Sequence, residues 1–177
     1  MKRHMKWIAL LLIVAVALVC VVAAELPPQP PNKVDAAISA GRLPPGYRDW
    51  RLISVAREEG DLDDIRAVLG NDVAIRAYRA GNRPFPDGTV IARLAWSYDP
   101  SEQNNRAFGR EQSFVAGHPK NGVQFMVKSS RKYAATGGWG YAQFEDGEPA
   151  DSAVHGTCAA CHDAAKAADF VFTRYAP

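Results

Sequence analysis

The stretch Thr-Val-Ile-Ala-Arg-Leu-Ala-Trp-Ser-Tyr, residues 89–98, has the clearest period-two pattern in the chain. In an extended strand, alternate side chains point to opposite faces. One face would carry Val90, Ala92, Leu94 and Trp96, and the other would carry Ile91, Arg93 and Ala95. The preceding Pro-Phe-Pro-Asp-Gly, residues 84–88, is a rigid turn that leads into this pattern. Residues 89–98 are therefore predicted to form a strand.

Four more segments have strand-like patterns: residues 50–55, 65–69, 123–128 and 139–144. In the third of these, three apolar side chains (Val123, Phe125 and Val127) alternate with Gln124, Met126 and Lys128. Residues 99–121 are polar and contain Gly and Asn, so we expect a long loop there, with room for short strands. About five strands are thus predicted, which makes the chain β-rich.

Short helices are predicted between and around these strands. Asn71 or Asp72 can cap a helix that Gly81 ends. Shorter helical segments are expected within residues 33–49 and at residues 129–133. The Ala-rich segment 150–168 has high helix propensity and follows all five strands. The predicted class is α+β and β-rich, with flanking short helices and a C-terminal helix.

The C-terminal helix carries the sequence Cys158-Ala159-Ala160-Cys161-His162. This C-x-x-C-H pattern is the attachment sequence for a c-type haem. Two thiols three positions apart can add to the two vinyl groups of one porphyrin, and the adjacent imidazole can bind the iron as proximal ligand. The alternatives are a redox C-x-x-C pair or half of a zinc site. We therefore expect one covalent haem c, bound by Cys158, Cys161 and His162, with His162 on the iron.

Residues 1–24 are predicted to be a signal peptide or an N-terminal anchor. A basic start is followed by an apolar run, residues 7–22, and small residues precede Glu25 as signal peptidase requires. If the leader is retained, residues 7–24 would tether the protein to the inner membrane. Either outcome places the remainder on the oxidising side, where bacterial haem c is attached, so we expect a periplasmic protein. Residues 25–44 begin with ELPPQPPN and read as a Pro-rich spacer before a domain at 45–177.

Charge and composition favour an ordinary globular domain. The formal net charge is +2, with 23% charged and 47% hydrophobic residues. Lys2, Arg3 and Lys6 all lie in the leader, and subtracting these three from +2 leaves −1 for the remainder. A basic surface is the usual requirement for nucleic-acid binding. We therefore expect no nucleic-acid partner.

Residues 45–177 resemble the cytochrome P-460 family, which includes the β-type cytochromes c′. The resemblance rests on the order and spacing of several short motifs: GYRDW at 46–50, FPDGTV at 85–90, VKSSRKY at 127–133, GW at 138–139, the C-x-x-C-H motif, and DFVFTRY at 169–175. It implies an antiparallel sheet with flanking helices, a homodimer, and a five-coordinate c-type haem. Members of the family oxidise hydroxylamine or bind small gases such as nitric oxide.

Two positions of this chain depart from the pattern of the hydroxylamine-oxidising members. Those members cross-link a lysine to the porphyrin, and the matching position here is Arg93. A guanidinium stays protonated and is a poor nucleophile, so no cross-link is expected. They also place a carboxylate near the distal face, where this chain has Gln124, which forms hydrogen bonds but does not take a proton near neutral pH. Arg93 and Gln124 are therefore the candidate distal-pocket residues, and Arg93 could hold a haem propionate or a bound anion.

The remaining question is the sixth position of the iron. Met126, His118 and His155 are the available side chains in the mature chain. Met126 would give an electron-transfer haem with a raised potential, while its alternative role is in the core. We expect an open site that binds a small gaseous or nitrogenous ligand or exchanges electrons with a redox partner protein. The alternative is a haem oxidoreductase acting on hydroxylamine or a related small nitrogen species.

Overall fold

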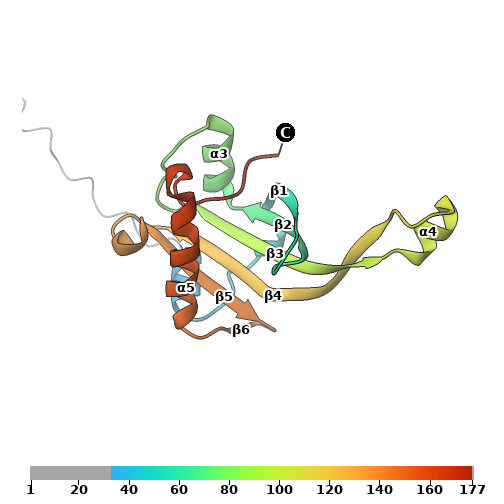
Figure 1. Ribbon diagram of the computed structural model, residues 1–177. Coiled ribbons are helices and arrows are strands. Elements are labelled where there is room, and N and C mark those ends of the chain that lie inside the picture. The colour runs from blue at the N-terminus through green and yellow to red at the C-terminus, as the bar shows by residue number, and fades with distance from the viewer. Residues whose placement is uncertain (1–32, 177) are drawn as a thin grey trace, which may run out of the picture. The chain divides into compact units, whose positions relative to one another are not determined.

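Six strands dominate residues 33–176, the part of the chain that the computed structural model describes. They are β1 (Arg51–Glu58), β2 (Asp64–Gly70), β3 (Val90–Pro100), β4 (Phe114–Lys128), β5 (Trp139–Glu145) and β6 (Glu148–Pro149). Neighbouring strands are antiparallel and follow one another in chain order (Figure 1). The predicted α+β, β-rich class is confirmed. The first five strands overlap the five predicted segments, with β1 and β3 each beginning one residue later than predicted, and β6 is a short addition.

Residues 1–32 lie outside the described residues. The predicted leader, residues 1–24, and the Pro-rich start of the predicted spacer therefore stay predictions from sequence. Within residues 33–176, no helix combines the length and the apolar character needed to cross a membrane.

The alternation predicted around β3 divides the sheet into two faces. Val90, Ala92 and Leu94 belong to one buried cluster, together with Val123, Phe125, Val127 and Phe144. Ile91 belongs to a second cluster on the opposite face. There Ile91 pairs across the strands with Met126, and Met126 pairs with Tyr141. We call these the α2 face and the α5 face, after the helices that cover them.

Helices cover both faces of the sheet. The α5 face packs against α5 (Ala153–His162), which continues into the 3-10 helix η3 (Asp163–Ala168), and against α3 (Asp72–Ala80). Figure 1 shows α5 crossing the strands on this side. The α2 face packs against Val34 and Ile38 of α2 (Lys33–Ser39) and against Tyr47 of the 3-10 helix η1 (Tyr47–Asp49).

The predicted caps of α3 are confirmed. The Asn71 side-chain oxygen accepts a hydrogen bond from Ala74 N at 2.9 Å, and Gly81 ends the helix in the left-handed conformation, φ 66°. The same Asn71 oxygen accepts from Val90 N at 3.1 Å. The cap therefore also ties α3 to the start of β3, because one side chain satisfies donors from both elements.

Residues 33–44, assigned from sequence to the spacer, are folded with the domain. The carboxylate of Asp35 in α2 accepts from Lys132 Nζ at 2.9 and 3.0 Å and from the Tyr133 hydroxyl at 2.8 Å. Val34 and Ile38 add apolar contacts to the α2 face. The short helical segment expected within residues 33–49 is present as α2, and its contacts place it in the same unit as the sheet.

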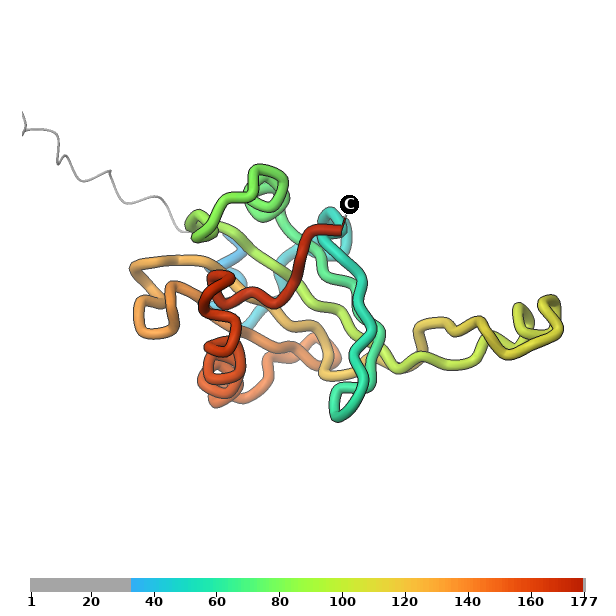
Figure 2. Tube along the Cα trace, turned by 45° about the horizontal axis from the view of Figure 1, so that its top comes forward, coloured from blue at the N-terminus to red at the C-terminus, as the bar shows by residue number. Residues whose placement is uncertain are grey.

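The segment 99–121, expected as a long loop, is instead a β-arm. β3 continues to Pro100, β4 begins at Phe114, and α4 (Glu102–Phe108) connects them. Both views show this arm projecting away from the rest of the sheet (Figure 1, Figure 2). The loop prediction was wrong because most side chains of the β4 part of the arm are exposed, so no alternation of apolar and polar residues marks the strand.

A helical turn joins β4 to β5, where a one- to two-turn helix was expected. Tyr133 N donates to Ser129 O at 3.0 Å, and the 3-10 helix η2 (Ala134–Thr136) follows. Gly137 then ends the turn with φ 67°. A Cβ added at Gly137 would overlap the ring of Phe170, so this glycine is required by both its backbone conformation and its neighbour.

Candidate functional site

The two motif cysteines lie one turn apart on α5. Both thiols are free; Cys158 is partly buried against the α5-face cluster, and Cys161 is exposed. Burial, together with the nearby Cys161, raises the pKa of the Cys158 thiol. Reactive redox cysteines have a lowered pKa, so this environment does not favour the redox C-x-x-C alternative. Residues 33–176 also contain no cluster of three or more His, Cys, Asp or Glu side chains suited to a metal ion.

His162 ends α5 with its ring directed into the fold. Its Nδ1 lies 2.7 Å from the carbonyl oxygen of Phe170, and its ring centre lies 5.0 Å from that of Tyr141 and 5.2 Å from that of Phe172. Burial lowers the pKa of His162, and the Phe170 contact partly opposes this shift. A carbonyl beside Nδ1 selects the tautomer that carries its proton there. The other ring nitrogen, Nε2, is then the one able to bind a metal.

A cavity of about 110 Å³ lies beside His162, between α5 and the sheet. Cys158 and His162 contribute one wall, and Arg93, Gln124 and Met126 of β3 and β4 contribute another. Most of the remaining lining is apolar or aromatic, from Val68, Ile91, Phe125, Tyr141, Ala142, Val171 and Phe172, with Arg66 and Thr173 at the polar end. Four of the five site residues predicted from the sequence, all except Cys161, therefore meet at one cavity.

Arg93 and Gln124 are directly opposite in the β3–β4 register and contact each other. Arg93 donates to the Gln124 side-chain oxygen at 2.9 Å, and Gln124 donates to the Gln143 oxygen at 2.8 Å. Burial and the charge of Arg66 lower the pKa of Arg93, while Asp64 opposes that shift. The ordinary pKa of an arginine side chain is so high that the Arg93 guanidinium stays cationic at neutral pH.

Asp64 was missed from sequence. It is fully buried on the α5 face, and it accepts hydrogen bonds from Arg66 at 2.7 and 2.9 Å and from Arg93. Both carboxylate oxygens are engaged by guanidinium groups, so Asp64 holds the two arginines in place. The only available signal was its position two residues before Arg66, which gives the two side chains the same strand face.

Tyr141 was also missed. It lines the cavity, it is buried, and its hydroxyl is the one buried side-chain polar atom without a hydrogen-bond partner in residues 33–176. Desolvation is the largest cause of the raised pKa of this phenol. A buried hydroxyl without a partner is costly and is characteristic of a site that receives a polar ligand or cofactor group. Together with the apolar walls and the two thiols, it suits a haem, which combines an apolar ring with polar substituents.

The three candidate sixth ligands are placed very differently. Met126 is buried and lines the cavity on the sheet side. His118 is exposed at the base of the arm, where its backbone nitrogen donates to Ser97 Oγ at 2.9 Å. His155 accepts at Nδ1 from Tyr141 N at 3.2 Å and so attaches α5 to β5. Neither histidine lines the cavity, which leaves Met126 as the only one of the three beside it.

A C-x-x-C-H helix packed over an apolar cavity in a β-rich α+β fold defines a haem-binding cytochrome. Residues 44–173 match the family model described as Cytochrome P460. The chain therefore belongs to the cytochrome P460 family, and the resemblance drawn from its motifs is confirmed. No curated protein sequence gave a significant match.

Proposed function

We propose that this protein is an exported mono-haem c-type cytochrome. Cys158 and Cys161 would each form a thioether bond with the porphyrin, and His162 Nε2 would bind the iron. The bound haem supplies an iron centre that takes a small ligand or exchanges an electron. One observation carries the proposal: Cys158 and His162 face the same cavity as Arg93 and Gln124.

We further propose that the haem binds a small ligand such as nitric oxide and performs no oxidative turnover. Among residues 33–176, the cavity lining contains no carboxylate. A general base that accepts a proton near neutral pH is normally a histidine or a carboxylate within hydrogen-bond reach. The cavity presents Arg93 and Gln124, which suit ligand stabilisation. The alternative, oxidation of hydroxylamine, is less well supported, because the lining offers no carboxylate and its one histidine, His162, would be bound to the iron.

The absorption spectrum of protein expressed in the periplasm tests this proposal. We expect a high-spin c-type spectrum that shifts when nitric oxide is added, and haem that remains on the chain in a denaturing gel. Replacing both Cys158 and Cys161 by Ala should abolish the covalent haem. A strongly red-shifted Soret band would indicate a modified porphyrin and would contradict the ligand-binding proposal.

Coordination of the iron is tested separately with Met126→Leu, which conserves volume. An open sixth position predicts the same high-spin spectrum in the variant and the parent. A low-spin parent that becomes high-spin in the variant would instead make Met126 a ligand and the protein an electron carrier.

We propose from the predicted leader, residues 1–24, that the protein is exported to the periplasm. Export of the chain with residues 1–24 removed would give a mature protein that starts at Glu25, whereas retention would leave residues 7–24 as an inner-membrane tether. Fractionation and the intact mass of the haem protein distinguish these two forms. Haem-containing protein recovered only from the cytoplasm would contradict export.

We also propose that the protein is a homodimer, as the family resemblance implies, and that it exchanges electrons with a redox partner protein. Three apolar side chains of the β-arm region, Phe108, Phe114 and Val115, are largely exposed and are available to a second copy. Sedimentation equilibrium of the parent and of Phe114→Ser measures the association. A monomeric parent at micromolar concentration would contradict the homodimer.

A further inference from the structure

The carbonyl group that contacts His162 belongs to an unusual segment of backbone. Asp169 and Phe170 both adopt the left-handed conformation, with φ 55° and 62°. Non-glycine residues in this region are strained and persist only where the surroundings hold them. Together these two residues turn the chain after η3 so that the Phe170 oxygen lies 2.7 Å from His162 Nδ1. The surroundings of Asp169 therefore bear directly on the proximal ligand.

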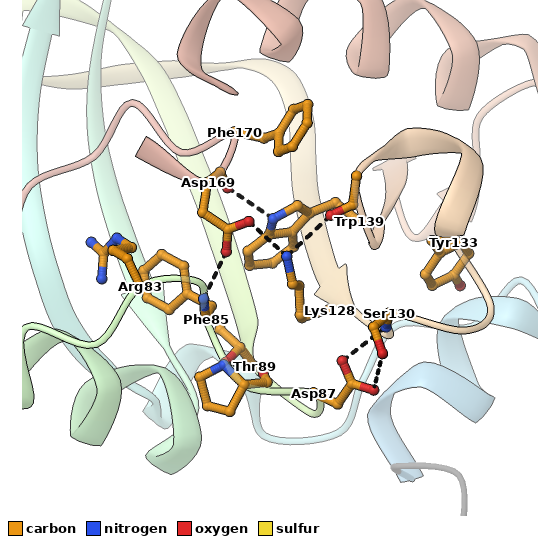
Figure 3. Close-up of polar contacts among 12 residues, drawn as sticks. Arg83, Phe85, Asp87, Thr89, Lys128, Ser130, Tyr133, Trp139, Asp169 and Phe170 are labelled. Atoms are coloured by element: carbon orange, nitrogen blue, oxygen red, sulfur yellow. Dashed lines mark hydrogen bonds and ion pairs between the residues drawn. The ribbon is translucent and has the colours of Figure 1, made fainter. Parts of the chain in front are cut away.

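A buried ion pair holds this segment in place (Figure 3). Lys128 Nζ lies 2.7 Å from Asp169 Oδ1, donates to Gly137 O at 3.1 Å, and sits 4.9 Å from the ring centre of Trp139. The second carboxylate oxygen of Asp169 accepts from Phe85 N at 2.7 Å. Trp139 Nε1 donates to the Asp169 carbonyl at 2.9 Å. Side chains or backbone from three separate segments, around Phe85, Lys128 and Trp139, thus converge on Asp169.

The burial of this pair suggests a role beyond stability. The side chains of Lys128 and Asp169 are only 6% and 9% exposed. Removing two charges from water costs roughly as much as their attraction returns, so buried ion pairs often add little net stability. Such a pair does supply a defined geometry, because the interaction between the two charges is lost if either side chain moves. Here that geometry places the Phe170 carbonyl.

We propose that Lys128 and Asp169 are positioning residues for the proximal histidine, an inference that rests on the proposed haem function. The ion pair fixes Asp169, Asp169 fixes the left-handed turn, and the turn holds the Phe170 oxygen against His162 Nδ1. That hydrogen bond sets the orientation of the imidazole and increases the electron donation of Nε2 to the metal. Partners of metal-bound histidines commonly act in this way.

Lys128→Met tests the proposal, because Met keeps the length of the side chain and removes its charge. Lys132→Met is the matched control. Lys132 lies in the turn after β4, and its ion-pair partner is Asp35 on α2. In ferrous haem protein we expect Lys128→Met to shift the iron–histidine stretching band in resonance Raman spectra to lower frequency and to raise the reduction potential. Lys132→Met should leave both unchanged.

Asp169→Asn provides a second variant if Lys128→Met fails to fold. Its amide oxygen can still accept from Phe85 N while the charge is lost, so a smaller shift in the same direction is expected. A variant that lowers the melting temperature without moving either the band or the potential would make the pair merely structural and would overturn the inference. Failure of the proposed function is distinguishable, because the parent would then carry no covalent haem at all.

Discussion

The Arg93 guanidinium donates to the side-chain oxygen of Gln124 at 2.9 Å, directly across β3 and β4. The amide N–H of Gln124 in turn donates to the side-chain oxygen of Gln143 at 2.8 Å, so both ends of the Gln124 amide are engaged. This arrangement fixes the amide orientation, and Arg93 and Arg66 are the two cationic side chains of the cavity wall. We therefore expect the sheet side of the proposed haem site to favour anionic ligands.

Arg93→Leu should weaken the binding of small anions to the ferric haem. A hydrogen bond to a charged group contributes about 1.5–3 kcal/mol, so we expect azide affinity to fall by roughly 10- to 150-fold. Binding of neutral imidazole should change far less, and the ratio of the two affinities separates charge from altered pocket shape. Spectrophotometric titration measures both. An equal loss for both ligands would contradict a role of Arg93 in anion binding.

Asp64→Asn should destabilise the fold markedly. Asp64 is fully buried between Arg66 and Arg93, and the substitution would leave Arg93 without its counter-charge and Arg66 with only the partly exposed Glu58. We expect the free energy of unfolding to fall by about 3–5 kcal/mol, as for other broken buried pairs. Glu58→Gln is the control, because its carboxylate is 47% exposed and 3.4 Å from Arg66, and it should cost less than about 1 kcal/mol. Urea unfolding with similar losses for both variants would argue against a structural role for the buried carboxylate.

Gly137→Ala should lower the free energy of unfolding more than the substitution of another glycine with a similar backbone conformation. Gly137 has φ 67° and faces Phe170, whereas Gly60 has φ 71° and no atom within 4 Å of an added Cβ. Gly60→Ala should cost about 1–2 kcal/mol from backbone conformation alone. Gly137→Ala should add about 1–3 kcal/mol from overlap with the Phe170 ring. Equal unfolding free energies for the two variants would mean that the Phe170 ring moves aside without cost.

The contact between α2 and Tyr133 should weaken at alkaline pH. Burial raises the pKa of Tyr133 above 10.0, and the pKa of Lys132 is also raised above 10.5 because interactions with Tyr133 and Asp35 outweigh the opposing effect of burial. Groups whose pKa is raised by folding contribute stability below their unfolded pKa and lose it as pH rises through the folded pKa. The parent should therefore lose stability at alkaline pH.

Tyr133→Phe tests this pH dependence. The variant lacks the hydroxyl that donates to Asp35 at 2.8 Å, so it should be less stable than the parent near neutral pH. The difference in unfolding free energy should shrink between about pH 8 and about pH 11, because the parent alone loses the tyrosine contribution. A difference that stays constant over this range would show that the hydroxyl does not titrate with the raised pKa.

Several parts of the fold and the site could be predicted because their signals are local. The alternation of residues 89–98 assigned each side chain to a face, and the structure places Ile91 and Val90 in different clusters accordingly. Asn71 and Gly81 marked both ends of α3. The arm could not be predicted in this way, since its strands are solvated on most of their surface and have no apolar period.

The amino-acid sequence by itself determined the spacing of Cys158, Cys161 and His162 on one helix, and it determined that Arg93 and Gln124 lie on the faces of their own strands opposite to Leu94 and Phe125. Helix and strand periods act over a few residues, so both features can be read locally. Only the tertiary structure decided which distant groups meet. Lys128 and Asp169 are 41 residues apart, and Arg93 and Asp64 are 29 apart. Such pairs depend on strand register and on the path of the chain after the haem motif. The strand register and the path of the chain leave no local pattern in the sequence. Both are decided by the burial of apolar surface, under the condition that every buried charge retains a partner.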